Sequence, residues 1–348
     1  MKPGSIPLLI GAALCIVGFA GYHWMTTPLI PYGDPGPSRI VDIPEGSTFR
    51  QVAILLEKEG MIASQWAFLL LGKLTRADRR ILAGEYALHP GMRPTDILTD
   101  LQSGRMVLHS VTIPEGYTAD QIADLLEQRG LAQKDEFVRL VHDRTFIQSL
   151  NLETASLEGY LFPNTYRFPR HKQARDLISI MVAGLWQAFT PEFHARARDV
   201  NMTPHQVLTL ASLIEKETSV GDERPLISAV FHNRLKRYIP LQSDPTVIYG
   251  LSAFNGNLTK RDLAVASPYN TYRVAGLPPG PIANPGADSI RAALYPAATT
   301  YLYFVSRNDG THKFSSTLVE HNRAVEKYQP VGRRDRHRPA PRSIQAPS

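Results

Sequence analysis

The chain has 348 residues, 43% of them hydrophobic and 20% charged, which is the composition of a folded protein long enough for two domains. Its formal net charge is +6, but residues 331–348 hold five arginines and one aspartate, so +4 of that charge (5 − 1) lies there. Nucleic-acid binding needs basic residues gathered on a folded face. The rest of the sequence is too nearly neutral to supply one, and we expect no nucleic-acid partner.

The N-terminus contains a long apolar run. Residues 6–25 (IPLLIGAALCIVGFAGYHWM) include no charged side chain, and about 20 such residues span the roughly 30 Å hydrocarbon core of a bilayer. Tyr22 and Trp24 fall where an interfacial aromatic belt would lie. A cleaved signal peptide is the alternative, but its apolar core is usually shorter and ends in a small-x-small site. The pattern favours an uncleaved transmembrane helix over residues 6–26.

Cys15, the only cysteine, lies inside this run, so the rest of the chain has no disulfide framework and no thiol nucleophile. Lys2 is the only basic residue ahead of Arg39, which favours a cytoplasmic N-terminus at residues 1–5 and a body outside the cytoplasm. An exported protein without disulfides suits the bacterial envelope. Residues 27–38 are rich in Pro and Gly and are expected to be a linker.

After the linker the chain repeats itself. IPEGSTFRQVAILLEKEGMI (43–62) aligns without gaps on IPEGYTADQIADLLEQRGLA (113–132). In each copy we expect a strand that ends at Pro, followed by a helix. The Thr-x-x-Gln that follows has the form of a capping box at the start of that helix. Gly60 and Gly130 are expected to end the two helices.

Each copy continues in the same way, with a second helical run and then a strand. The two helical runs are 64–74 and 134–143, and the two strands are 81–88 and 163–168. The β-α-α-β unit resembles a LysM-like fold, which binds glycan chains in other proteins. A structural duplication without a ligand is the alternative. We assign a LysM-like module to residues 39–105 and a second repeat to residues 106–168.

Longer helices are expected in the remainder, and the class is mixed α+β. Helices are predicted over 174–189, 202–218, 223–237 and 318–328, and a buried strand over 301–307. The helix over 202–218 has Thr203 as its N-cap, with Pro204 and Gln206 in the first turn. In the helix over 223–237, the side chains of Leu226, Val230 and Phe231 are expected to face the core. The Pro- and Arg-rich residues 331–348 are expected to be a disordered tail.

Motifs of several enzyme classes are missing. The sequence has no His-x-x-x-His or other close histidine pair for zinc, no G-x-S-x-G elbow, no Walker loop and no dinucleotide-binding glycine fingerprint. We therefore expect neither a metal site nor a cofactor. Metallohydrolase, serine hydrolase and nucleotide-dependent enzyme all become less favoured.

Two glutamates stand out in ASLIEKETS (211–219). Residues two apart on a helix are about 200° apart, so Glu215 and Glu217 cannot face one another and are not a catalytic pair. With Val207, Leu210, Ala211 and Ile214 as the inner stripe, the two carboxylates fall on opposite flanks. One can line a cleft while the other makes a salt bridge or meets solvent. The spacing does not say which, and a solvated surface glutamate is the alternative for each.

Two later segments carry polar and aromatic residues in loops. In LQSDPTVIYG (241–250) they surround a proline that is expected to forbid a regular helix. SPYNTYRVAGLPPGPIANPGADS (267–289) is a long Pro- and Gly-rich loop. Stiff loops with amides, hydroxyls and aromatic rings suit sugar binding, and a structural Ω-loop is the alternative. The candidates for lining a cleft are Gln242, Ser243, Asp244, Thr246, Tyr269, Asn270 and Tyr272.

Several of these blocks together resemble a known family. In order, ASLIEKET, NRL, LQSDPTVIYG, YNTY, GLPPGPIANPG and the YLYFV strand are similar to the endolytic murein transglycosylases of the MltG (YceG-like) type, as is EGYLFPNTYRF (158–168). The resemblance covers nearly the whole chain and implies a catalytic domain over residues 106–330. The tail after residue 331 matches no feature of the family.

The resemblance implies a lytic reaction that needs one carboxyl group. Such enzymes cleave the bond between N-acetylmuramic acid and N-acetylglucosamine within a strand, and the C6 hydroxyl of the muramic acid closes a 1,6-anhydro ring in place of water. A hydrolase needs two carboxylates instead. The family pattern assigns the general acid and base to Glu217, at the edge of an apolar helix where desolvation favours a protonated carboxyl. It leaves Glu215 and Thr218 in supporting roles.

The resemblance also implies partners and a location. We expect peptidoglycan strands as substrate, the inner membrane as anchor with the catalytic domain in the periplasm, and glycan-polymerising synthases as neighbours whose elongating strands the enzyme terminates. Two alternatives remain. A non-catalytic peptidoglycan-binding scaffold would keep its function without Glu217. A muramidase-type hydrolase would use Asp244 as a second carboxylate.

Overall fold

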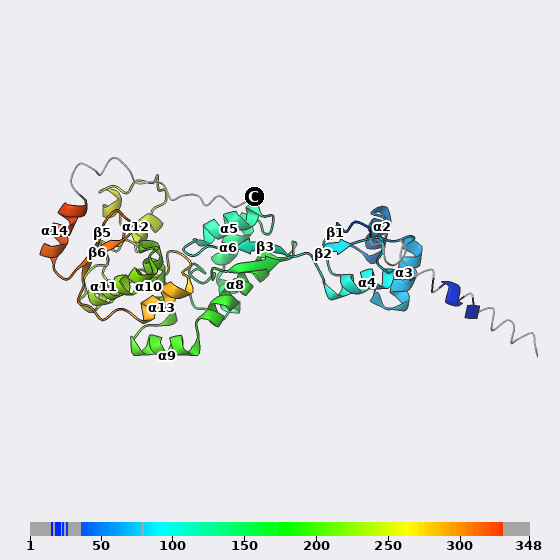
Figure 1. Cartoon of the computed structure of the whole chain (residues 1–348), viewed down its shortest axis with the longest axis horizontal. Coiled ribbons are helices and arrows are strands. Elements are labelled where there is room, and N and C mark those ends of the chain that lie inside the picture. The colour runs from blue at the N-terminus through cyan, green and yellow to red at the C-terminus, as the bar shows by residue number, and fades with distance from the viewer. Residues whose placement is uncertain are drawn as a thin grey trace, which may run out of the picture. The chain divides into compact units, whose positions relative to one another are not determined.

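The computed structural model describes residues 15–16, 18–21, 23, 26, 36–77, 80–170 and 172–329 (Figure 1). The predicted transmembrane segment 6–26 lies mostly outside these residues, and residues 1–5 and 331–348 lie outside them entirely. No helix among the described residues is long and apolar enough to cross a membrane. The chain divides into two compact units: residues up to Ser110 with Arg167–Lys172, and Val111–Tyr166 with the residues from Gln173 onward.

Between Arg39 and Ser103 the first unit forms a two-stranded sheet and three helices. In chain order these are β1 (Arg39–Ile43), α2 (Phe49–Lys58), α3 (Gln65–Leu74), β2 (Gly84–Leu88) and α4 (Pro94–Ser103). β1 and β2 pair antiparallel, with Val41 opposite Tyr86. Their inward side chains share one hydrophobic core with Leu56, Phe68 and Leu101 of the three helices. The core therefore includes α4, a helix that the sequence did not predict.

The second unit begins with the predicted repeat. Its elements are β3 (His109–Thr112), α5 (Ala119–Gln128), α6 (Lys134–Val141), α7 (Arg144–Ser149) and β4 (Thr165–Phe168), and β3 pairs with β4 in a two-stranded sheet. The division between the units falls inside β3 and β4. The order β-α-α-β is thus observed in both copies, with α7 as an extra helix in the second. Whether either copy is LysM-like in more than this order stays a prediction.

Local signals explain why both copies fold alike. Thr48 and Thr118 each accept a hydrogen bond from the backbone N–H of the glutamine three residues later, whose side chain bonds back to the threonine N–H, so both predicted capping boxes are present. Gly60 and Gly130 follow the two helices with φ of +71° and +63°. Glycine adopts this left-handed conformation without a side-chain penalty, which confirms the predicted helix ends.

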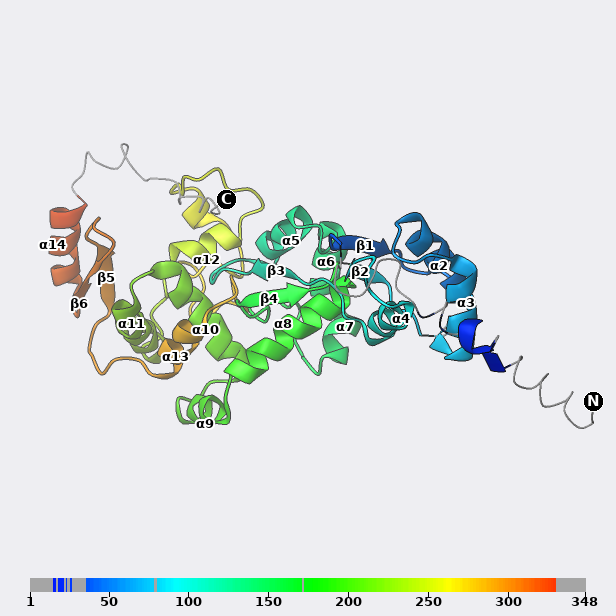
Figure 2. The ribbon, with the colours of Figure 1, turned by 45° about the vertical axis from the view of Figure 1, so that its right-hand side comes forward.

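The remainder of the second unit is mostly helical (Figure 2). It contains α8 (Ala174–Ala188), α9 (Pro191–Asp199), α10 (Pro204–Glu217), the 3-10 turn η2 (Gly221–Glu223), α11 (Arg224–Lys236), α12 (Asp244–Tyr249), the 3-10 turn η3 (Asp262–Ala264), α13 (Ala287–Leu294), β5 (Tyr303–Ser306), β6 (His312–Ser315) and α14 (Leu318–Tyr328). The four predicted helices correspond to α8, α10, α11 and α14. α10 packs against α9, α11, α12 and α13, which makes it the central helix of this unit.

The structure corrects three expectations. Every residue from Val207 to Ile214 is buried, so α10 has no single inner stripe, because helices surround it. Pro245 does not forbid a helix: α12 begins at Asp244, and a proline in the first turn removes an N–H that has no partner within the helix. β5 is not a buried strand: among the described residues it pairs with β6 alone, in a hairpin, and Val305 is its one buried residue.

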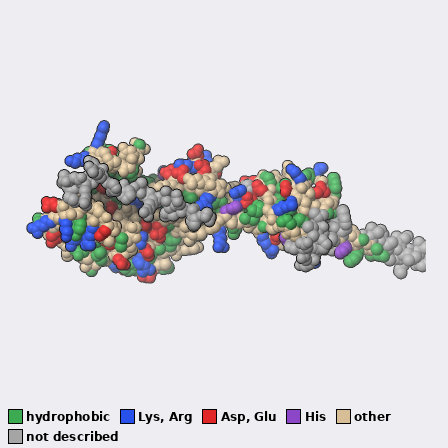
Figure 3. Space-filling view, turned by 45° about the horizontal axis from the view of Figure 1, so that its top comes forward, with side chains coloured by type: hydrophobic (Ala, Val, Ile, Leu, Met, Phe, Trp, Pro, Cys, Tyr) green, Lys and Arg blue, Asp and Glu red, His purple; other side chains and the backbone are tan. Residues whose placement is uncertain are grey.

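The predicted class and inner face are mostly confirmed. On the inner face predicted for α11, Val230 and Phe231 are buried, but Leu226 is only half-buried. On the face shown in Figure 3, lysine and arginine side chains are interspersed with acidic ones rather than gathered in one patch. The mixed α+β class is confirmed by the small two-stranded sheets and the many helices.

Candidate active site

The candidate site lies where α10 ends. Thr203 and Gln206 form a capping box that begins the helix, and Thr218 ends it in an extended conformation (φ −145°, ψ 142°). Glu217 is the last helical residue and is half-buried. Its Oε1 accepts a hydrogen bond of 2.5 Å from the hydroxyl of Ser243, a residue that is only 2% exposed. A buried helix thus presents one carboxyl group to the residue just before α12.

Glu215 has different neighbours. Its Oε2 accepts from the backbone N–H of Gly286, the N-cap of α13, at 3.0 Å. Its Oε1 lies 3.6 Å from the guanidinium of Arg224 in α11, and its side chain is 7% exposed. Arg224 is also 3.8 Å from Glu115 and 3.7 Å from Asp288. The prediction that the two glutamates are not a pair is confirmed: Glu215 joins α10 to α11 and α13.

The second carboxyl near Glu217 belongs to Asp244. The hydroxyl of Tyr272 donates to Asp244 Oδ1 at 2.7 Å. Burial raises the pKa of Tyr272 above its ordinary value, and the charges of Asp244 and Glu217 raise it further, so the phenol stays a hydrogen-bond donor. The structure therefore brings together Glu217, Ser243, Asp244 and Tyr272, which we call the Glu217 cluster.

Backbone contacts hold this cluster in place. Gln242 has φ of +55°, a left-handed conformation that costs a non-glycine residue on the order of 1 kcal/mol. Its N–H donates to Thr271 O at 3.0 Å, and the N–H of Ser243 donates to Thr271 Oγ1 at 3.0 Å. The hydroxyls of Thr246 and Thr271 lie 2.8 Å apart. Thr271, which the sequence did not single out as a site residue, thus fixes the segment that carries Ser243.

Two further predicted site residues direct their polar groups into the protein. Asn270 is fully buried, and its Nδ2 donates to Leu263 O at 3.0 Å and Val265 O at 2.8 Å. Thr246 is also fully buried. The rings of Tyr269 and Tyr249 pack with centroids 4.9 Å apart. In the structure these side chains hold the loops behind the Glu217 cluster.

Arg234 is a buried cation that sequence reasoning passed over, although it stands in the NRL block. Its guanidinium donates to Pro240 O and Leu241 O at 3.0 Å, to Gln242 Oε1 at 3.1 Å and to Leu302 O at 2.7 Å. Burial lowers its pKa, but an arginine remains charged in proteins. Arg234 therefore ties α11 to the segment before α12 and to the residue before β5.

Glu158 is the second residue that sequence reasoning missed. It is 5% exposed, and its Oε1 accepts from Ala119 N at 3.1 Å and from Asn284 Nδ2 at 3.0 Å. The hydroxyl of Tyr249 lies 3.5 Å from its Oε2. Burial raises the pKa of Glu158 to about 7, against the lowering effect of the Ala119 N–H. This carboxyl joins the start of α5, the end of α12 and the loop before α13.

Asn284 completes that junction. It is fully buried, its Oδ1 accepts from Leu161 N at 2.8 Å, and its Nδ2 also donates to Tyr117 O at 2.9 Å. Its backbone O accepts from Gly116 N at 2.8 Å. The loop containing GLPPGPIANPG is therefore fastened to the turn of the second repeat. Gly159 must be glycine here, since it has φ of +84° and a Cβ atom would overlap the ring of Pro281.

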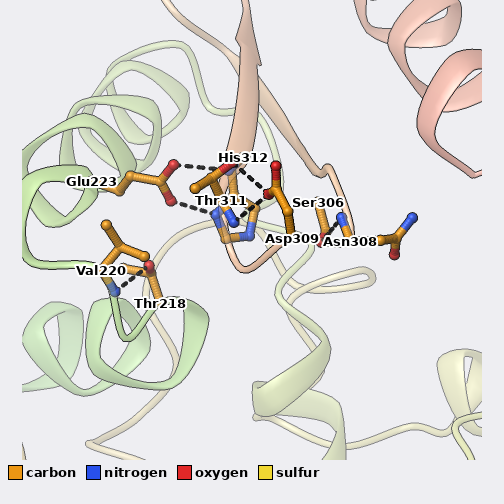
Figure 4. A network of polar contacts seen from close by, with 8 residues as sticks. All are labelled: Thr218, Val220, Glu223, Ser306, Asn308, Asp309, Thr311 and His312. Atoms are coloured by element: carbon orange, nitrogen blue, oxygen red, sulfur yellow. Dashed lines mark hydrogen bonds and ion pairs between the residues drawn. The ribbon is translucent and has the colours of Figure 1, made fainter. Parts of the chain in front are cut away.

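The segment after Glu217 is held by a second network (Figure 4). Thr218 Oγ1 accepts from Val220 N at 3.0 Å. The carboxylate of Glu223, in η2, accepts from the backbone N–H of His312 at 2.8 Å and lies 2.7 Å from its ring Nδ1. Both side chains are about 11–12% exposed. The hairpin β5–β6 is thereby fastened to the turn that follows α10.

We expect Glu223→Ala to lower the free energy of unfolding by about 2–3 kcal/mol, because it leaves two nearly buried donors of His312 without an acceptor. Urea denaturation measures this loss. Glu326→Ala, at an exposed position of α14, is the matched control and should change stability by less than about 0.5 kcal/mol. An equal effect of the two substitutions would show that the network does not stabilise the fold.

The Glu217 cluster does not coincide with either of two cavities in the second unit. One cavity of about 590 Å³ lies between α11 and residues 296–301, and another of similar size lies beside α7. Neither is lined by a member of the Glu217 cluster. Among the residues that the structure describes, no three His, Cys, Asp or Glu side chains are grouped so as to hold a metal ion.

The chain has relatives among known proteins. Residues 41–327 match the YceG-like family. The chain is 37% identical to the endolytic murein transglycosylase of Bacillus subtilis over 304 residues, which is 83% of this chain and 84% of that protein. It is 32% identical to the protein of the same name from Streptococcus pneumoniae, covering 92% of this chain and 64% of that protein. A solved yceG-like protein from Listeria monocytogenes has a TM-score of 0.57, with 36% identity over 82% of this chain and 98% of that one.

Proposed function

Because the chain belongs to the YceG-like family, we propose that it is an endolytic lytic transglycosylase that cleaves the glycan strands of peptidoglycan. Two relatives with this activity in their names cover 83% and 92% of the chain. The observation that carries the proposal is the half-buried Glu217 at the end of α10, hydrogen-bonded to Ser243. A single carboxyl group held in a fixed direction is what this chemistry needs.

In the proposed reaction Glu217 serves first as acid and then as base. Its proton moves to the oxygen that joins C1 of N-acetylmuramic acid to N-acetylglucosamine, and that C1–O bond breaks. The Glu217 carboxylate then takes the proton of the muramic acid C6 hydroxyl, whose oxygen bonds to C1. The ring closes as a 1,6-anhydro sugar, Glu217 regains its proton, and no water is consumed.

Ser243 is proposed to orient the acid. Its hydroxyl binds Glu217 Oε1 at 2.5 Å and so fixes the plane of the carboxyl group. Asp244 is proposed to bind substrate rather than to activate water, because its Oδ1 already accepts from Tyr272. Gln242, Thr246, Tyr269 and Asn270 are proposed to shape the cleft through the loops that they hold.

The products distinguish lytic cleavage from the alternatives. Purified peptidoglycan incubated with the full-length chain is digested, and the new strand ends are identified by mass spectrometry. We expect 1,6-anhydro ends and, for endolytic cleavage, strands of intermediate length from the first minutes. Reducing ends would indicate a hydrolase, with Asp244 as the second carboxylate. No new ends would favour a peptidoglycan-binding scaffold.

Ser243→Ala should reduce kcat by about 10- to 100-fold, a fraction of the 10²–10⁴-fold that general acid–base catalysis contributes. KM should change little, because the hydroxyl is already engaged in its hydrogen bond to the acid. Ser243→Thr keeps a hydroxyl and should restore part of the rate. Steady-state release of anhydro ends measures both parameters. A rise in KM at unchanged kcat would place Ser243 in substrate binding instead.

The cellular context is part of the same proposal. The apolar residues 6–26 would anchor the chain in the inner membrane, with the catalytic part in the periplasm. Anchoring would restrict cleavage to strands near the bilayer, which suits the termination of strands that synthases are still elongating. The first unit would bind glycan if it is LysM-like in function as well as in element order.

A further inference from the structure

The first unit carries an apolar surface that its own core does not use. In α3, Phe68 and Leu71 are each 1% exposed and belong to the core, whereas Trp66, Leu70 and Leu74 are 67%, 49% and 64% exposed. Positions i, i+4 and i+8 of a helix share one face. These three side chains therefore form a continuous line, which we call the α3 stripe.

Positive charge borders the α3 stripe. The guanidinium of Arg50, in α2, lies 6.0 Å from the centre of the Trp66 ring. Lys73 is exposed on α3, which has no acidic residue. Over residues 65–80 the sequence has four basic residues and one acidic residue, a net charge of +3 (4 − 1). A helix with a Trp/Leu face and basic flanks is typical of segments that lie in the interface of an anionic bilayer.

With residues 6–26 as the anchor, the linker would keep this surface near a membrane. Residues 27–38 connect the proposed anchor to β1, and twelve residues reach at most about 43 Å even when fully extended. The first unit is thus confined to a thin layer above the bilayer, so that a weak surface contact is populated. A sugar chain is a poorer match, because the stripe offers it few polar groups beyond the indole N–H of Trp66.

We propose that the α3 stripe lies in the headgroup region of an anionic bilayer, with Trp66 at the interface and Lys73 and Arg50 against lipid phosphates. This contact rests on the proposed membrane anchor at residues 6–26. It gives the first unit one fixed face toward the membrane. It also assigns to α3 a role that packing of the first unit does not explain, since the core is complete without the stripe.

Lipid-borne quenching tests the contact in the full-length chain. Cys15→Ser with Leu70→Cys carries an environment-sensitive fluorophore and is reconstituted into vesicles of phosphatidylglycerol and phosphatidylethanolamine with doxyl-labelled lipid. Asp96→Cys, at an exposed position of α4, is the control. We expect several-fold stronger quenching at position 70 than at 96, and the same at Leu74→Cys. Charge reversal by Lys73→Glu should weaken the quenching at position 70.

Equal quenching at positions 70 and 96 would overturn the proposal. The proposal would also be overturned if quenching at position 70 depended on the density of the protein in the vesicles and not on the fraction of doxyl-labelled lipid. The stripe would then contact a second copy of the chain. A response to added glycan fragments alone would assign the stripe to glycan and would overturn the proposal as well. Flotation of carbonate-washed vesicles tests the anchor separately: a chain that does not float contradicts the anchor and this contact together. Release of anhydro ends reports on catalysis independently of both.

Discussion

Glu217→Gln should lower the rate of strand cleavage by at least about 10³-fold, near the upper range for general acid–base catalysis, because one carboxyl serves as both acid and base. The amide cannot donate a proton to the glycosidic oxygen or accept one from the C6 hydroxyl. Its carbonyl oxygen can still accept from Ser243, so the fold should be unchanged. Quantitative mass spectrometry of new strand ends measures the loss.

Two other glutamate-to-glutamine variants serve as controls for Glu217→Gln. Glu326→Gln, on the exposed face of α14, should leave the rate unchanged. Glu215→Gln should lower stability, because it weakens the contacts to Arg224 and Gly286, while the rate per folded molecule falls far less than in Glu217→Gln. If Glu215→Gln removed all cleavage and Glu217→Gln did not, the acid would be Glu215, and the role proposed for Glu217 would be wrong.

Glu158→Ala should reduce the free energy of unfolding by roughly 3 kcal/mol, because it leaves the buried N–H of Ala119 and the amide of Asn284 without their acceptor. Glu158→Gln should cost less than Glu158→Ala, since its carbonyl can take the place of Oε1 and accept both bonds, while its NH₂ lies near the Tyr249 hydroxyl and the Ala119 N–H. Urea denaturation at pH 6 measures both. Equal losses in the two variants would show that the acceptor at position 158 does not hold the junction together.

The pH dependence of stability follows from the same carboxyl. The pKa of Glu158 is raised from 4.5 to about 7 in the folded protein. Between these values the folded state holds a proton that the unfolded state has lost, so this group's contribution to stability falls as pH rises from about 4.5 to about 7. The loss is on the order of 3 kcal/mol. This pH-dependent loss should be absent in Glu158→Gln. The difference in free energy of unfolding between the wild type and Glu158→Gln should therefore change between about pH 4.5 and about pH 7.

Local signals were enough to predict much of the fold. Thr203 and Gln206 are three residues apart, and so are the caps of α2 and α5, so each helix start could be identified from a short stretch of sequence. The sequence patterns of β1 and of Gly60 recur 70 residues later in β3 and Gly130. Each copy therefore supports the assignment of the other. The short helix α12 could not be predicted from the presence of Pro245 alone, because proline breaks a helix interior but is tolerated in the first turn.

Less of the candidate site than of the fold could be predicted from the sequence. That Glu215 and Glu217 diverge follows from helix geometry alone, and the structure confirms it. The roles of Arg234, Glu158 and Asn284 depend on partners far along the chain: Glu158 and Asn284 are 126 residues apart. Nothing in the local pattern distinguishes a glutamate buried against such a partner from a solvated one. For the same reason the sequence grouped Asn270 with the cleft residues, although the fold buries it.

The central claim is that Glu217 cleaves strands without water, and a reaction in H₂¹⁸O tests it most directly. Peptidoglycan is incubated with the full-length chain in the heavy water, and each new strand end is examined by mass spectrometry for ¹⁸O. We predict anhydro ends without ¹⁸O, and no new ends with Glu217→Gln. Muramic acid ends that carry one ¹⁸O would contradict the claim, because water would then be the nucleophile.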